Sequence, residues 1–205
     1  AFIAALSLSG CALVNQSGGD DNPCNCAVSQ ANQDSTVNLG QTSTGIVALA
    51  QSFKVLNDTT IYGVQVSVAR SASLHPPLTV EIHADNGGQP ATFPLMTSAV
   101  VSSTNSSPDF ESFCFDASCS SVTLALTANT QYWIVLSRPG GSTTPDPTDY
   151  SIIGYQSSNF QGEKAMLKAT GAPTVWAQLT GSTNLTNAAM VFRLGCGNTA
   201  NGCSL

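Results

Sequence analysis

Charged side chains are scarce in this sequence, because Asp, Glu, Lys and Arg together make up 9% of the residues, against roughly 25% in ordinary soluble proteins. Only 6 residues are Lys or Arg, and the formal net charge is −6. Binding to phosphate requires a basic surface, so this balance argues against nucleic acid and leaves no basic cluster for anionic lipid. The polarity comes from Ser, Thr, Asn, Gln and Gly, which suits a secreted β protein.

Motifs that carry catalysis are also missing. There is no GxSxG nucleophile turn, no CxxC pair for zinc, and only two histidines, His75 and His83. Glu81 and Asp85 are close enough in sequence to raise the question of a glycosidase pair, but the simpler interpretation is two solvated carboxylates beside a hairpin. Both histidines are interpreted as surface or edge residues. We therefore expect a protein that is not an enzyme.

The segment HADNGG has two interpretations. Asp85 and Asn86, together with backbone oxygens, are the kind of ligands that Ca²⁺ takes. Asn-Gly is also the strongest short-range signal for a β-hairpin. We favour the hairpin and expect no cofactor, with calcium at Asp85 and Asn86 as the alternative.

Cysteine usage points to an oxidising compartment. The chain has 7 cysteines, and without Cys11 an even number remains, which fits a set of disulfides. Two tight spacings each predict a disulfide that closes a small loop, namely Cys114–Cys119 and Cys196–Cys203. Cys24 and Cys26 are too close to pair comfortably with each other, so their partners stay open.

Three regions follow one another along the chain. Residues 1–14 are almost wholly apolar, residues 15–43 are a polar, turn-rich linker or arm, and residues 44–205 are the expected β domain. In the last region, short β-like runs are broken by turn residues about every 8–12 residues, and no helical period is sustained. This pattern predicts an all-β fold, an antiparallel two-sheet sandwich of jelly-roll type. The candidate strands are 48–55, 60–69, 78–84, 95–103, 121–127, 131–138, 150–156, 164–169, 174–179 and 188–194.

Alternation within these strands predicts which side chains face the core. In LTVEIHA, the apolar residues Leu78, Val80 and Ile82 alternate with more polar residues, among them Glu81 and His83. Both tryptophans are candidates for stacking against sugars. Trp133, within the apolar run YWIVL, is predicted to belong to the core, whereas the role of Trp176 in its shorter strand stays open.

The order and spacing of several blocks resemble a known kind of bacterial surface domain. The blocks are AQSFKVLNDTTIYGVQVSVARS, PLTVEIHADNGGQPAT, LALTANTQYWIVLSRPGG, APTVWAQL and AAMVFRL. They resemble jelly-roll modules of the choice-of-anchor type, which are similar in layout to carbohydrate-binding β-sandwiches. The resemblance covers about residues 44–195. It implies a location on a cell surface and no catalytic residue.

The N-terminal stretch LSLSGCALV also has two interpretations. Leu8-Ser9-Gly10-Cys11 matches a bacterial lipobox, in which Cys11 becomes lipidated and the preceding apolar segment is too short to span a membrane. As a β-strand, residues 1–14 have one apolar side, formed by Phe2, Ala4, Leu6, Leu8, Gly10, Ala12 and Val14. Such a strand can complete the sheet of a neighbouring copy. Donor-strand pili assemble in this way, and a head-to-tail contact that does not close generates a filament.

We therefore expect an extracellular structural protein, the subunit of a surface filament or pilus, assembled head to tail by insertion of the donor strand into the next copy. The alternative is a surface lipoprotein, lipidated at Cys11, whose β-sandwich binds carbohydrate such as surface glycans. Neither interpretation includes a transmembrane helix. Sequons for glycosylation occur at Asn15, Asn57, Asn105 and Asn184, and they matter only if the host modifies asparagine.

Overall fold

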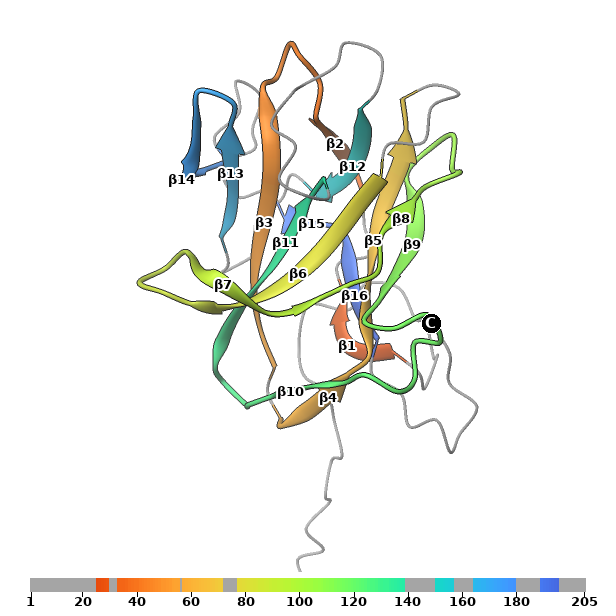
Figure 1. Ribbon diagram of the computed structural model, residues 1–205, viewed down its shortest axis with the longest axis vertical. Coiled ribbons are helices and arrows are strands. Elements are labelled where there is room, and N and C mark those ends of the chain that lie inside the picture. Colours follow the sequence, from red (N-terminus) through yellow and green to blue (C-terminus); the bar gives the residue numbers. More distant parts are fainter. Residues whose placement is uncertain are drawn as a thin grey trace, which may run out of the picture.

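The computed structural model describes residues 25–29, 33–55, 57–71, 77–138, 150–156, 164–179 and 189–195. In these residues the regular structure is entirely β, and the strands pair antiparallel throughout. Two seven-stranded sheets form a sandwich, and a two-stranded ribbon lies at one end (Figure 1). The predicted all-β, antiparallel two-sheet fold is confirmed.

The first sheet has the order β1-β16-β5-β12-β15, with β9 beside β5 and β2 beside β12. Its strands are β1 (Asn25–Ser29), β2 (Ser35–Leu39), β5 (Gly63–Arg70), β9 (Asp109–Cys114), β12 (Ser151–Gln156), β15 (Ala189–Met190) and β16 (Phe192–Gly195). β5 is the central strand. It pairs with β9 along one side and with β16 and then β12 along the other.

The second sheet has the order β14-β13-β3-β11-β6-β7, with β8 beside β6. Its strands are β3 (Ile46–Lys54), β6 (Pro77–Asp85), β7 (Pro90–Thr97), β8 (Val101–Ser102), β11 (Gln131–Ser137), β13 (Ala165–Ala169) and β14 (Ala172–Gln178). The ribbon at the end consists of β4 (Thr59–Ile61) and β10 (Leu124–Leu126). In the second sheet, β7 and β14 are the edge strands.

The main core lies between the two sheets. The predicted alternation is confirmed in β6, where Leu78, Val80 and Ile82 are fully buried in this core. Aromatic side chains connect the two layers, because the ring of Phe53 on β3 lies 6.0 Å from that of Phe192 on β16. Burial of such apolar side chains is the main driving force for folding.

Strands β3 and β11 are buried on both faces. Every residue of β3 except Lys54 is buried, as expected for a strand that reads as a nearly continuous apolar run. On the face turned away from the main core, Ala50, Trp133 and Val135 form a second small cluster, against which Trp176 packs. Trp133 is therefore a core residue, as predicted, but it belongs to the outer face of the second sheet.

Two parts of the sequence form strands that the polar pattern had concealed. The segment 15–43, expected to be a linker or arm, contains β1 and β2. In β2 only Val37 and Leu39 are apolar and buried, and their polar neighbours masked the alternation. Strand β9 was also missed, because Asp109 and Glu111 interrupt its apolar residues.

Burial in the sandwich can be tested with two identical substitutions. Val66→Ala removes two methyl groups from a side chain that is 0% exposed on β5, whereas Val175→Ala does so on edge strand β14, where Val175 is 59% exposed. We expect Val66→Ala to lower the free energy of unfolding by about 2–3 kcal/mol, and Val175→Ala by less than about 0.5 kcal/mol. Urea denaturation measures both. Equal losses would contradict the placement of the core.

Candidate ligand-binding site

The outer face of the second sheet carries a pocket of about 410 Å³. Its floor contains Ala48 from β3 and Val135 and Ser137 from β11. The register places Ala48 opposite Ser137, so small side chains adjoin across the two central strands. The neighbouring strands carry larger side chains on this face, and the difference in size makes the sheet surface hollow.

Two hairpins form the walls of the pocket. The β13–β14 hairpin supplies Lys168, Thr174 and Trp176. The Lys168 ammonium lies 4.4 Å from the centre of the Trp176 ring, within the range of a cation–π contact. The β6–β7 hairpin supplies the opposite wall, with Glu81, His83, Asn86, Gln89, Pro90, Ala91 and Thr92. In Figure 1 both hairpins extend toward the same side of the molecule.

The turn between β6 and β7 is the hairpin that the sequence predicts. The backbone N–H of Asn86 donates a hydrogen bond of 2.8 Å to the carbonyl of Gln89. Gly87 and Gly88 have φ values of 65° and 86°, a region that glycine adopts without steric cost. The turn thereby places the Asn86 and Gln89 side chains in the lining of the pocket.

Asp85 acts as a hydrogen-bond acceptor that fixes this hairpin to the sheet. Its carboxylate accepts hydrogen bonds from Trp133 Nε1 at 2.8 Å, from Gln131 Nε2 at 2.7 Å and from the Gly88 backbone at 3.1 Å. Burial alone would raise the pKa of Asp85, but these hydrogen bonds and the charge of Lys164 bring the pKa below its usual value. Both carboxylate oxygens accept from N–H groups, an environment that does not support the calcium interpretation of Asp85 and Asn86.

His83 is buried, which corrects the expectation of a surface or edge histidine. It is 5% exposed and lies on a strand between β11 and β7. Its Nδ1 lies 2.8 Å from the Ala91 carbonyl oxygen, and its Nε2 lies 3.0 Å from Oε2 of Glu81. Glu81 is more exposed and faces the pocket with part of its carboxylate. The pair therefore connects the wall of the pocket to β7.

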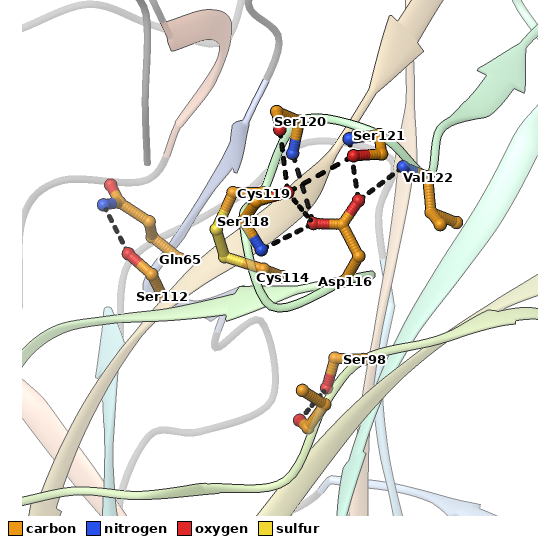
Figure 2. The surroundings of a disulfide bond; sticks show 11 residues. Gln65, Ser98, Ser112, Cys114, Asp116, Ser118, Cys119, Ser120, Ser121 and Val122 are labelled. Carbon is orange, nitrogen blue, oxygen red and sulfur yellow. Dashed lines mark hydrogen bonds between the residues drawn. A yellow bond between two sulfur atoms is a disulfide. The ribbon is translucent and has the colours of Figure 1, made fainter.

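The disulfide expected at Cys114–Cys119 fits the structure, in which the two residues are bonded and their Cα atoms lie 4.8 Å apart. Figure 2 shows the Asp116 carboxylate beside this disulfide, facing Ser118, Ser121 and Val122. It accepts hydrogen bonds from the Ser118 hydroxyl at 2.8 Å and from the Ser121 backbone at 2.7 Å. Together with further backbone N–H donors, beginning with that of Val122, these bonds hold the pKa of Asp116 far below its usual value. This loop is a self-contained structural unit, and it does not line the pocket.

Many of the predicted site residues lie outside the described residues. They are the donor-strand residues Phe2, Ala4, Leu6, Leu8, Gly10 and Val14, together with Cys11, Cys24, Asn15, His75, Asn184, Cys196 and Cys203. Of the remaining sequons, Asn57 is exposed. The Asn105 amide nitrogen donates to the Val68 carbonyl at 3.3 Å, so a glycan on that nitrogen would disturb a contact with β5.

Searches of protein-family models, of curated proteins and of solved structures find no match to this chain. The resemblance to choice-of-anchor-type modules therefore stays a prediction from the sequence blocks. In the described ranges, no helix is long and apolar enough to cross a membrane. The same part of the chain contains no group of three or more His, Cys, Asp or Glu residues arranged to hold a metal ion.

Sequence reasoning missed Lys168 and the amide side chains of the pocket. Lys168 lies in the candidate strand 164–169, and this short run does not show which side chains surround it. Trp176 was identified as a candidate sugar platform, and the structure brings it to the pocket beside Lys168.

The contact between Asp85 and Trp133 should stabilise the fold. Asp85→Ala leaves the Trp133 N–H buried without its acceptor, so we expect a loss of about 1–3 kcal/mol in the free energy of unfolding. Asp109→Ala, at an exposed carboxylate that accepts from the neighbouring Phe110 backbone, should cost less than about 0.5 kcal/mol. Chemical denaturation measures these values. A double-mutant cycle with Trp133→Phe isolates the contact, and an Asp85→Ala loss that is unchanged in that background would contradict it.

Proposed function

We propose that this chain is a non-enzymatic, extracellular β-sandwich module that binds carbohydrate in the pocket on its outer face. The observation that supports this function is the combination of Trp176 with amide and hydroxyl side chains around a floor of small residues. The volume of about 410 Å³ falls in the range of roughly 300–1,000 Å³ that is typical of sites for small ligands.

The chemistry of the lining fits a sugar ring better than a wholly apolar ligand. A pyranose has C–H groups on its faces and hydroxyl groups around its edge. Trp176, Ala48 and Val135 provide apolar surface, while the polar side chains that line the same pocket are Ser137, Thr92, Thr174, Asn86 and Gln89. Aromatic surface together with a few placed polar groups is the usual composition of a binding site for such molecules.

The lining also supports binding without catalysis. Hydrolysis of a glycoside uses two carboxyl groups on either side of the scissile bond. Among the residues that line this pocket, Glu81 supplies the carboxylate, and one of its oxygens is engaged by His83. The Cys114–Cys119 disulfide supports an oxidising, extracellular location.

Replacing Trp176 tests this function. Trp176→Ala should lower the affinity for a bound glycan at least about tenfold, because it removes the aromatic surface on which a sugar ring stacks. A tenfold loss corresponds to about 1.4 kcal/mol, in the range that aromatic contacts contribute. Phe93→Ala is the matched control, because Phe93 is an exposed aromatic residue on β7 (81%) outside the pocket. A glycan array followed by calorimetry measures binding, and thermal unfolding verifies that both variants are folded. Equal effects of the two substitutions would place the binding site elsewhere.

A second candidate function is the filament subunit expected from residues 1–14. Exposed apolar side chains on the two edge strands of the second sheet favour it, namely Phe93 and Leu95 on β7 and Val175 on β14. An edge strand has one unpaired row of backbone groups, to which a strand from another copy can add. Pro90 and Pro94 remove two N–H donors from β7, whereas Pro173 removes one from β14, so β14 keeps more of its donors.

This second function is tested at the N-terminal strand. Leu8→Asp places a charge on the apolar side of the expected strand, and Ser7→Asp places the same charge on the other side. We expect Leu8→Asp, like deletion of residues 1–14, to abolish polymers, because an unpaired buried carboxylate costs several kcal/mol. Ser7→Asp should have a smaller effect. Electron microscopy and light scattering measure assembly, and filaments of normal length from the truncated chain would exclude the donor-strand mechanism.

A further inference from the structure

Both ring nitrogens of His83 contact oxygen atoms of the β6–β7 hairpin. Nδ1 lies 2.8 Å from the Ala91 carbonyl oxygen, and Nε2 lies 3.0 Å from a carboxylate oxygen of Glu81. The buried ring therefore fixes one oxygen of the Glu81 carboxylate.

The contact with His83 engages one oxygen of the carboxylate in the wall of the pocket. The other charged groups near His83 are Asp85 on the same strand and Lys168 on β13, and the residues of β7 and β11 that line the pocket are uncharged. Asp85 accepts hydrogen bonds from Trp133, Gln131 and Gly88, and it lies near the positive charge of Lys164. Among the described residues, no carboxylate is in contact with the Lys168 ammonium in this way.

Lys168 lies in the pocket where its positive charge can bind an anionic group of a ligand. Its ammonium rests over the Trp176 ring, and among the described residues no carboxylate lies within 4.0 Å of it. Burial lowers the pKa of Lys168, although the more distant negative charge of Glu81 opposes this effect. A partly desolvated cation with no carboxylate in contact is stabilised when an anionic group binds beside it.

We propose that the pocket selects glycans that carry an anionic substituent, a carboxylate or a sulfate, and that Lys168 binds this group beside a sugar ring stacked at Trp176. The proposal rests on the proposed carbohydrate-binding function and specifies its ligand class. The overall charge of the chain is −6, which by itself would repel an anionic ligand. Selection therefore depends on the local charge of the pocket and not on the net charge of the protein.

Calorimetry on the full chain with matched glycans tests the ligand class. The probes are an oligogalacturonate for the carboxylate, dextran sulfate for the sulfate, and maltohexaose and unmodified dextran as neutral counterparts. We expect at least one anionic probe to bind about tenfold or more tightly than its neutral counterpart, in the range of a hydrogen bond to a charged group. The difference should shrink as salt is added. The two anionic probes show which substituent is preferred.

Substitutions assign the effect to Lys168. Lys168→Met keeps an unbranched side chain over Trp176 and removes the charge, so it should abolish the preference for the anionic probe, measured as the ratio of its affinity to that of the neutral counterpart. Lys54→Met is the matched control, because Lys54 is exposed at the end of β3 and does not line the pocket. Glu81→Gln removes the negative charge from the lining and should strengthen binding of dextran sulfate several-fold.

The outcomes separate the ligand class from the binding function. Equal affinity for anionic and neutral probes, or a loss of anionic preference in Lys54→Met equal to that in Lys168→Met, would overturn the selection by Lys168 while leaving carbohydrate binding in place. Binding of neither class of probe would overturn the proposed function together with this inference.

Discussion

The pairing of β3 with β11 is the constraint on which both the core and the pocket depend. Its register sets Ala48 opposite Ser137 and Ala50 opposite Val135, so that small side chains lie together on the outer face. The same register sends Leu49 and Leu136 into the main core. A shift by one residue would exchange the two faces of a strand. It would turn the small side chains of the pocket floor toward the main core and expose the leucines, so packing between the sheets also maintains the site.

The outer face shows how a strand buried on both sides can still support a binding surface. Trp133 and Ala50 are covered by neighbouring side chains, yet the adjacent positions are small enough to leave space above them. The large residues stand on the flanking hairpins, where the β6–β7 turn is held by Asp85. The walls are hairpins and the floor is the centre of a sheet, and the hydrogen bond from Trp133 to Asp85 joins the two.

Much of the fold could be predicted from local patterns, whereas the site could not. Alternation in β6 correctly assigned Leu78 and Ile82 to the core and Glu81 and His83 to the other face. It could not show that β7 contacts His83, because that contact depends on the irregular register between β6 and β7. The contact of Lys168 with Trp176 is made within the β13–β14 hairpin. Their place opposite Glu81 depends on the strand order β13-β3-β11-β6. Strand β9, in which Asp109 and Glu111 interrupt the apolar residues, is identified only from its pairing with β5 in the structure.

The position of β5 determines how the sandwich can open. Its backbone is bonded on one side to β9 and on the other to β16 and then β12, strands that are distant from one another in the chain. Each β5 amide bonds to only one of these flanks, and β9 is paired in this sheet with β5 alone. The β5 amide protons that face β16 and β12 therefore exchange with solvent only in a wider opening of the sandwich, whereas those that face β9 exchange when this strand separates. The edge strands β7 and β14 can fray, and take up deuterium, while the rest of the sandwich stays folded.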